Sequence, residues 1–169
     1  MKRILVASLL LALTLPVLAV PATRPAVLAG ARYHVEHSVF TELPFDSGDL
    51  SYTLGWEYHD QNGFWQLLVG YAPEIGGTNG VDYVVTPQLN LLLEDRGWQA
   101  GVGALSSYVV TEDESDWTSI YWQFLLGFTL QLPAFSIDIM SYYPFESWGK
   151  LSDFDAGDIE FGVMVKFFY

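Results

Sequence analysis

The stretch DIEFGVMVKFFY, residues 158–169, decides the fold of this chain. Its side chains fall on two alternating faces. One face is apolar throughout: Ile159, Phe161, Val163, Val165, Phe167 and Tyr169. The other mixes charged, small and apolar residues: Asp158, Glu160, Gly162, Met164, Lys166 and Phe168. Because successive side chains of a β-strand point to opposite faces, this period of two predicts a strand with one continuous apolar face.

The same alternation recurs upstream of residue 158. Seven further strands are expected, over residues 31–40, 50–59, 64–72, 83–94, 98–105, 121–132 and 134–145. His37 interrupts the apolar face of the first of these strands. Beyond the N-terminal region, no stretch approaches the roughly 20 uninterrupted apolar residues that a membrane helix needs. The chain is therefore predicted to be all-β, with eight strands in total.

Short and long connections alternate between the expected strands. The short ones are turns at Asp60-Gln61-Asn62-Gly63, at Asp95-Arg96-Gly97 and at Pro133. Glycine suits such hairpin turns because it tolerates a positive φ. The long ones are expected over residues 41–49, 73–82, 112–116 and 146–157. This asymmetry is typical of outer-membrane barrels, which have short periplasmic turns and longer external loops.

The apolar face could meet either a soluble core or lipid. A soluble lipocalin-like barrel or sandwich would turn that face inward and its polar face to water. The chain holds 6 Trp, 10 Tyr and 11 Phe, and many of them fall near the expected strand ends. Trp and Tyr favour membrane interfaces. We therefore expect an antiparallel up-and-down transmembrane β-barrel of eight strands, with its mixed face lining the interior.

The N-terminus has the pattern of an export signal. Lys2 and Arg3 precede a mostly apolar run over residues 4–15, and the stretch Val17-Leu18-Ala19 offers a cleavage site. A second site follows Ala29. Residues 1–19, or 1–29, are predicted to be a signal peptide, residues 20–30 a periplasmic tail if they are retained, and residues 31–169 the barrel.

The final residues also resemble a known signal. An apolar face that ends on Val165, Phe167 and Tyr169 is similar to the C-terminal assembly signal of bacterial outer-membrane barrels. In architecture, the whole mature chain resembles the small eight-stranded members of that class. The resemblance implies a Gram-negative outer-membrane location, contact with membrane lipid and lipopolysaccharide, and assembly by the barrel-assembly machinery. It leaves the oligomeric state open.

Charged residues on the inward face are expected to form a network. An eight-stranded barrel is just wide enough for side chains to fill it. We expect Arg32 to lie near Glu57, and Lys166 near Asp138, in one acidic cluster formed where the first and last strands meet. The predicted lumen network is Arg32, Glu36, Glu57, His59, Asp138, Glu160 and Lys166.

The sequence offers little sign of catalysis. Two enzyme groups share this architecture, the lipid A deacylase and palmitoyltransferase barrels, and both use a histidine with a serine and a supporting acid. The histidines here are His34, His37 and His59, with Ser38 and Ser51 as nearby serines and Glu36 or Glu57 as possible acids. The expected register points His37 outward and Ser38 inward, which separates them. We therefore expect a non-enzymatic structural or envelope-maintenance role, with a lipid A-modifying enzyme or a narrow porin-like solute pore as alternatives.

Composition and charge bear on which cofactors, metals and partners the chain could bind. With 0 cysteines, no phosphate loop, no clustered metal motif and no basic surface, we expect no cofactor, no metal and no nucleic-acid partner. The chain carries 20 acids against 7 bases, and loss of Lys2 and Arg3 leaves 5 − 20 = −15, or −16 if Arg24 is also removed. Many acids fall in the long connections. They are expected to form a solvated, repulsive surface, with divalent-cation binding beside lipopolysaccharide as the alternative.

Overall fold

A computed structural model describes residues 25–37, 43–60, 63–75 and 80–169 of the chain. The predicted signal peptide lies outside these residues, apart from the segment 25–29. In chain order the strands are β1 Pro25–Tyr33, β2 Leu50–Asp60, β3 Gly63–Ile75, β4 Val81–Asp95, β5 Trp98–Leu105, β6 Tyr108–Thr111, β7 Ser115–Trp117, β8 Tyr121–Gln131, β9 Ser136–Phe145 and β10 Glu160–Phe168. Two short 3-10 helices, η1 Trp148–Asp153 and η2 Ala156–Asp158, precede β10.

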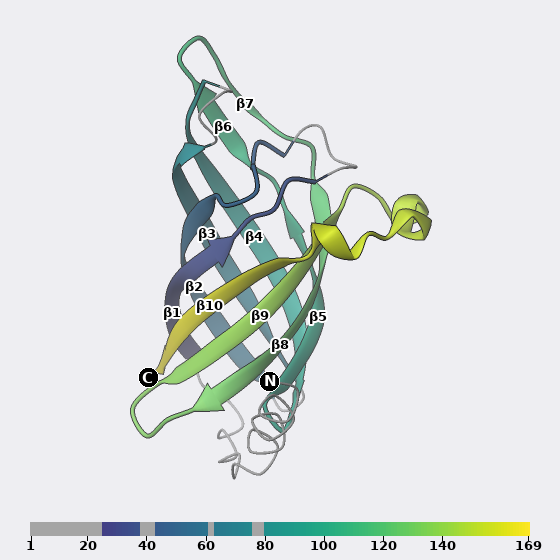
Figure 1. Cartoon of the computed structure of the whole chain (residues 1–169). Helices are drawn as coiled ribbons and strands as arrows, with labels where there is room; N and C mark the ends of the chain where they lie inside the picture. Colours follow the sequence, from purple (N-terminus) through teal and green to yellow (C-terminus); the bar gives the residue numbers. More distant parts are fainter. Residues whose placement is uncertain (1–24, 38–42, 61–62, 76–79) are drawn as a thin grey trace, which may run out of the picture.

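Eight of these strands close into an antiparallel barrel (Figure 1). Each strand pairs with its neighbours in the order β3, β2, β1, β10, β9, β8, β5, β4, and β4 then pairs with β3 to close the ring. The remaining two, β6 and β7, form a hairpin that extends the sheet alongside β4. The expected eight-stranded antiparallel barrel is confirmed.

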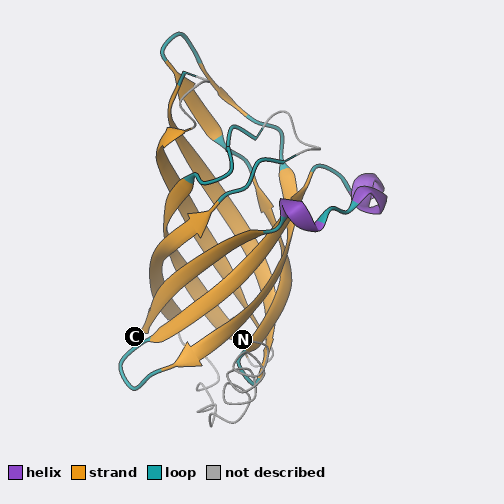
Figure 2. Ribbon diagram, in the orientation of Figure 1, coloured by secondary structure: helices purple, strands orange, loops and turns teal. Residues whose placement is uncertain are grey.

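The two ends of the barrel differ in their connections (Figure 2). At one end, called here the turn end, the Asp95–Trp98 pair is closed by Arg96 and Gly97, with φ of 50° and 85°. Positive φ at both central residues is the geometry of a tight two-residue hairpin. The opposite end, called the loop end, carries the β6–β7 hairpin and both 3-10 helices. The C-terminus lies at the turn end (Figure 1).

The first strand was predicted too late in the chain. It runs over Pro25–Tyr33, not over residues 31–40, so the barrel begins before the expected boundary at residue 31. Small residues obscure its alternation in the sequence, PAVLAGARY. Its pairing is nevertheless continuous on both sides: Val27 pairs with Phe167 of β10 and with Trp56 of β2. Residues 112–116 also differ from expectation, because β7 begins within that expected loop.

The exterior of the barrel is apolar and its interior is polar. On the outer face, Leu54, Leu91 and Leu93 are 67%, 58% and 69% exposed. On the inner face, Gln66, Asn90 and Glu57 are fully buried. This is the reverse of a soluble barrel, which places its apolar side chains inside.

Aromatic side chains ring the turn end. The Trp56 and Trp65 rings pack edge to face with centroids 5.6 Å apart. The Trp56 indole donates to the hydroxyl of Tyr169 over 3.1 Å. Phe167 and Tyr169, two residues of the predicted assembly signal, are both exposed on the outer surface. At the loop end, Trp122 packs against Trp148 of η1 with centroids 5.7 Å apart.

Candidate functional site

Polar side chains fill the lumen in three levels. The turn-end cluster consists of Lys166, Glu57, Asp138 and His59. The loop-end cluster consists of Arg32, Glu160, His34, His37 and Ser51. Between them lies an amide layer of Gln66, Asn90, Gln123 and Gln88. Each of these side chains projects inward from its segment, and each belongs to a residue that is less than a tenth exposed.

Lys166 organises the turn-end cluster. Its Nζ lies 2.8 Å from Oδ2 of Asp138 and 2.9 Å from Oε2 of Glu57. His59 also contacts that carboxylate, with Nε2 2.8 Å from Oε2 of Glu57. The predicted Lys166–Asp138 pair is therefore present, and the partner of Glu57 is Lys166.

Arg32 lies far from that cluster, contrary to the prediction. Because β1 starts at Pro25, Arg32 falls near the loop end of the strand, opposite Ser51 of β2 and Gly162 of β10. Its Nε donates to Oε2 of Glu160, and its guanidinium stacks 4.1 Å above the centroid of the Tyr142 ring. The expected Arg32–Glu57 pair and the single acidic cluster are therefore wrong: the bases occupy separate clusters.

The amide layer joins the two clusters. Gln66 donates to Glu57, and Asn90 Nδ2 donates to Oε1 of Gln66 over 3.2 Å. Gln123 Nε2 then donates to Oδ1 of Asn90 over 2.8 Å, and Arg32 donates to Oε1 of Gln123 over 3.0 Å. A hydrogen-bonded chain thus runs from Lys166 to Glu160 through the barrel. Sequence reasoning missed these amides because it looked for charges, although the period-two pattern places them all on the inward face.

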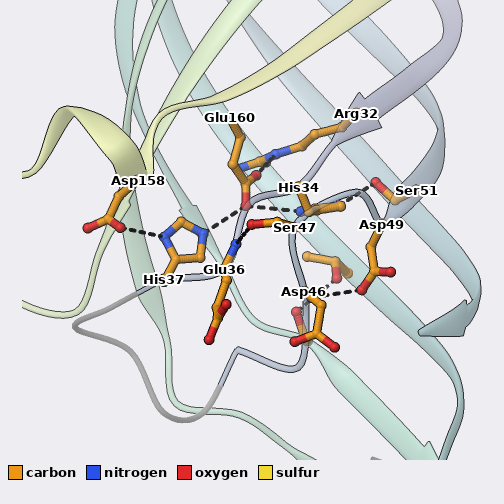
Figure 3. Close-up of polar contacts among 12 residues, drawn as sticks. Arg32, His34, Glu36, His37, Asp46, Ser47, Asp49, Ser51, Asp158 and Glu160 are labelled. Atoms are coloured by element: carbon orange, nitrogen blue, oxygen red, sulfur yellow. Dashed lines mark hydrogen bonds and ion pairs between the residues drawn. The ribbon is translucent and has the colours of Figure 1, made fainter. Parts of the chain in front are cut away.

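Glu160 holds three donors of the loop-end cluster (Figure 3). Besides Arg32, its Oε1 lies 3.0 Å from Nδ1 of His34 and 2.8 Å from Nε2 of His37. His37 was expected to point outward, and that prediction is wrong. Glu36 was expected inside, yet it is exposed. The physical reason is that β1 ends at Tyr33, so strict alternation is lost between His34 and His37. Ser38 lies outside the described residues.

Ser51 completes a second hydrogen-bonded chain in this cluster. The Nε2 of His34 lies 2.9 Å from Oγ of Ser51, while its Nδ1 contacts Glu160. The His34 ring is held flat by Phe45, with ring centroids 3.7 Å apart and planes within 8°. Sequence reasoning named Ser51 and His34 but assigned the acid to Glu36 or Glu57. Nothing in local spacing connects either residue to Glu160, more than a hundred residues away.

A pocket lies beside the hydrogen-bonded series Ser51, His34 and Glu160. Ser51, His34 and Glu160 line it together with Leu43, Phe45, Leu105 and Pro144. Thr86 and Gln88 of β4 line the polar side. His34 follows the last residue of β1, and burial lowers the pKa of its imidazole, which the Glu160 carboxylate raises to a smaller extent. The imidazole is therefore neutral at neutral pH. No group of three or more His, Asp or Glu within the described ranges is arranged to hold a metal ion.

These features define the class of the molecule: a small, closed, eight-stranded antiparallel β-barrel with an apolar exterior and a filled polar interior. Among solved structures, the crystal structure of Neisserial surface protein A is similar to it at 14% sequence identity. The alignment covers 87% of this chain and 96% of that one, with a TM-score of 0.49. No protein-family model and no curated protein matches the chain.

Proposed function

We propose that this chain is an integral protein of the bacterial outer membrane with a structural, envelope-maintenance role. The observation that carries the proposal is the inverted polarity of the barrel. Its outer face exposes rows of Leu, Val and aromatic side chains, which in water would form a large apolar patch prone to aggregation. In a bilayer the same face meets lipid, and ring closure leaves no unpaired strand edge in the hydrocarbon.

The filled lumen supports a structural role over transport. Gln66, Asn90 and Gln123 are fully buried across the middle of the barrel. Because hydrogen bonds link these three amides and both charged clusters, opening a water path would leave buried polar groups without partners. Lipid, lipopolysaccharide and the assembly machinery are the partners we propose.

Cell fractionation tests the location. The full chain, expressed in a Gram-negative host, is expected in the outer-membrane fraction and to migrate faster on a gel before boiling than after it. Recovery as a soluble periplasmic protein with no such shift would overturn the proposal.

Deletion of the gene in its own host tests the role. We expect the outer membrane of the deletion strain to admit a periplasmic reporter substrate faster, and the wild-type chain to restore the barrier. Lipid A mass spectrometry on the same strains addresses the enzyme alternative, because a lipid A-modifying activity would change the acyl pattern. Unchanged permeability without the protein would contradict an envelope-maintenance role.

A further inference from the structure

The proton arrangement at Ser51 follows from its neighbours. An ionised carboxylate only accepts hydrogen bonds, so Glu160 requires Nδ1 of His34 to carry its proton. Since burial keeps the imidazole neutral, Nε2 then holds a lone pair. The hydroxyl of Ser51, 2.9 Å away, must donate to it. Serine, histidine and glutamate therefore stand in the order that activates a serine for attack.

Gly70 of β3 leaves room for one further carbon atom beside the Ser51 hydroxyl. A Cβ at this position would lie 3.7 Å from each of three atoms: Oγ of Ser51, Nε2 of Gln88 and the backbone oxygen of Thr86. The other atom of the Gln88 amide accepts a hydrogen bond from Arg32, and because arginine only donates, that atom must be the oxygen Oε1. The atom near Ser51 is therefore the nitrogen Nε2. The amide N–H of Gln88 thus faces the same space as the serine. A reacting carbonyl there could meet a nucleophile and an oxyanion donor together.

We propose that Ser51 is a nucleophile for short-chain carboxylic esters, with His34 as its general base and Glu160 as a positioning residue. Oγ of Ser51 bonds to the ester carbonyl carbon while its proton passes to Nε2 of His34. The carbon–oxygen bond to the alcohol then breaks, and His34 returns the proton to the departing alkoxide. Water attacks the acyl-serine in the same way, releasing the acid and restoring Ser51.

The pocket sets the class of substrate. Ser51 is only 4% exposed, so the acyl group must be small. The walls near it are apolar, formed by Phe45, Leu105 and Pro144. The strong acidic balance of the chain disfavours anionic substrates. These features favour a neutral ester with a short acyl group that enters from the loop end. This inference concerns the site around Ser51 and does not depend on the proposed envelope-maintenance role.

The test uses the full mature chain folded in detergent micelles. Diethyl 4-nitrophenyl phosphate is a small neutral reagent that phosphorylates activated serines and releases 4-nitrophenolate. We expect one adduct, located by peptide mass spectrometry on Ser51. Hydrolysis of 4-nitrophenyl acetate should require the same residue, and the palmitate ester should not react. An unmodified Ser51 in the folded wild-type protein would overturn the proposal, and so would modification spread over several serines.

Matched variants separate chemistry from folding. Ser107→Ala is the control, because Ser107 is also a buried serine but its hydroxyl bonds Thr86 instead of a histidine. It should keep the Ser51 adduct, whereas Ser51→Ala should abolish it. His34→Gln should slow labelling roughly 100-fold, since a general base contributes at least that much. Gly70→Val fills the space before Ser51 with the triad intact, and should also block labelling. Equal labelling of His34→Gln and wild type would contradict the mechanism.

The positioning role of Glu160 is tested by the pH dependence of the labelling rate, because a purely structural role would also reduce activity. Of the charged and titratable groups facing His34, Glu160 raises its pKa, whereas Arg32 and His37 lower it. Glu160→Gln should therefore move the acid limb of the labelling rate to lower pH. If the acid limb of the pH profile does not move in the folded Glu160→Gln variant, Glu160 does not act as the positioning residue of His34. If the variant does not fold, adduct location in the wild-type protein still decides the proposal.

Discussion

Lys166 and Glu57 form an ion pair that reaches across an entire strand of the barrel. Lys166 lies on β10 and Glu57 on β2, with β1 between them, and Nζ is 2.9 Å from Oε2. Beneath the pair, β1 presents Ala26 and Leu28, the partners of Glu57 and Lys166 in the register. The small Ala26 side chain leaves room for the two charged side chains to meet. The pair therefore holds together the strands that flank the N-terminal strand of the barrel.

Loss of the Lys166 charge should weaken the folded barrel. Lys166→Met leaves Glu57 and Asp138 buried without their cation, and breaking a buried pair in this way costs about 3–5 kcal/mol. The measurement is the urea dependence of unfolding in liposomes. Adding Asp138→Leu should recover only part of the loss, because Glu57 still lacks its lysine. The control Arg96→Met replaces an exposed arginine and should leave the free energy of unfolding nearly unchanged. If the effects of Lys166→Met and Asp138→Leu on that free energy are strictly additive, the two residues are not coupled.

The success and failure of the sequence predictions have a common physical origin. Strict alternation over β10 and β9 places Lys166 and Asp138 on one face, and the pair they form was predicted. Depth in the barrel, however, depends on where each strand starts. Because β1 was predicted too late in the chain, Arg32 was predicted to lie at the wrong end of the barrel. Because alternation is lost beyond Tyr33, the predicted inward and outward directions of Glu36 and His37 were exchanged. Contacts across the closed ring, such as His34 with Glu160, depend on the register of several strands at once.

Assembly should depend on the outward aromatics of the last strand. Changing Phe167 and Tyr169 to Ser, or deleting Tyr169, should abolish insertion while leaving export intact. Both side chains are outward and exposed, and Tyr169 accepts from Trp56. The measurement is the amount of heat-modifiable protein in the outer membrane. Phe161→Ser is the matched control on the same face at the loop end, and a normal level of the truncated chain would argue against the signal.

The mature chain should begin at Val20. Cleavage after Ala29 would remove the first half of β1, including the buried Ala26 and Leu28. It would also strip β2 and β10 of their partners at the turn end and expose two strand edges. N-terminal sequencing of the outer-membrane form checks this directly. A mature start at Gly30 would mean that the barrel closes without half of β1.

The loop end should face the outside of the cell. It carries the longer connections, as the external side of such barrels does. Most of the acidic residues of the sequence fall in or beside these connections. An epitope inserted at Asp113, between β6 and β7, should bind antibody on intact cells with little loss of fold. The same epitope in the tight turn at Arg96 should be hidden until the outer membrane is opened. The reverse pattern would invert the orientation of the barrel.

The wild-type barrel should not conduct ions. Its amide layer closes the lumen at the level where Gln123 Nε2 donates to Oδ1 of Asn90 over 2.8 Å. Gly103 makes this closure possible, because a Cβ there would collide with the Asn90 side chain. Eight strands leave an interior that side chains can fill completely, so removal of this layer should open a narrow path.

Single-channel recording in planar bilayers tests the closure. We expect no steady conductance from the purified wild-type chain, and discrete steps from the double variant Asn90→Ala with Gln123→Ala. The control is Leu91→Ala with Leu126→Ala on the lipid-facing side, which removes side chains from the same two strands without touching the lumen. Steady conductance from the wild-type protein would refute the plugged interior and favour the pore. A silent lumen variant that remains folded would show that the flanking charged clusters close the barrel without the amides.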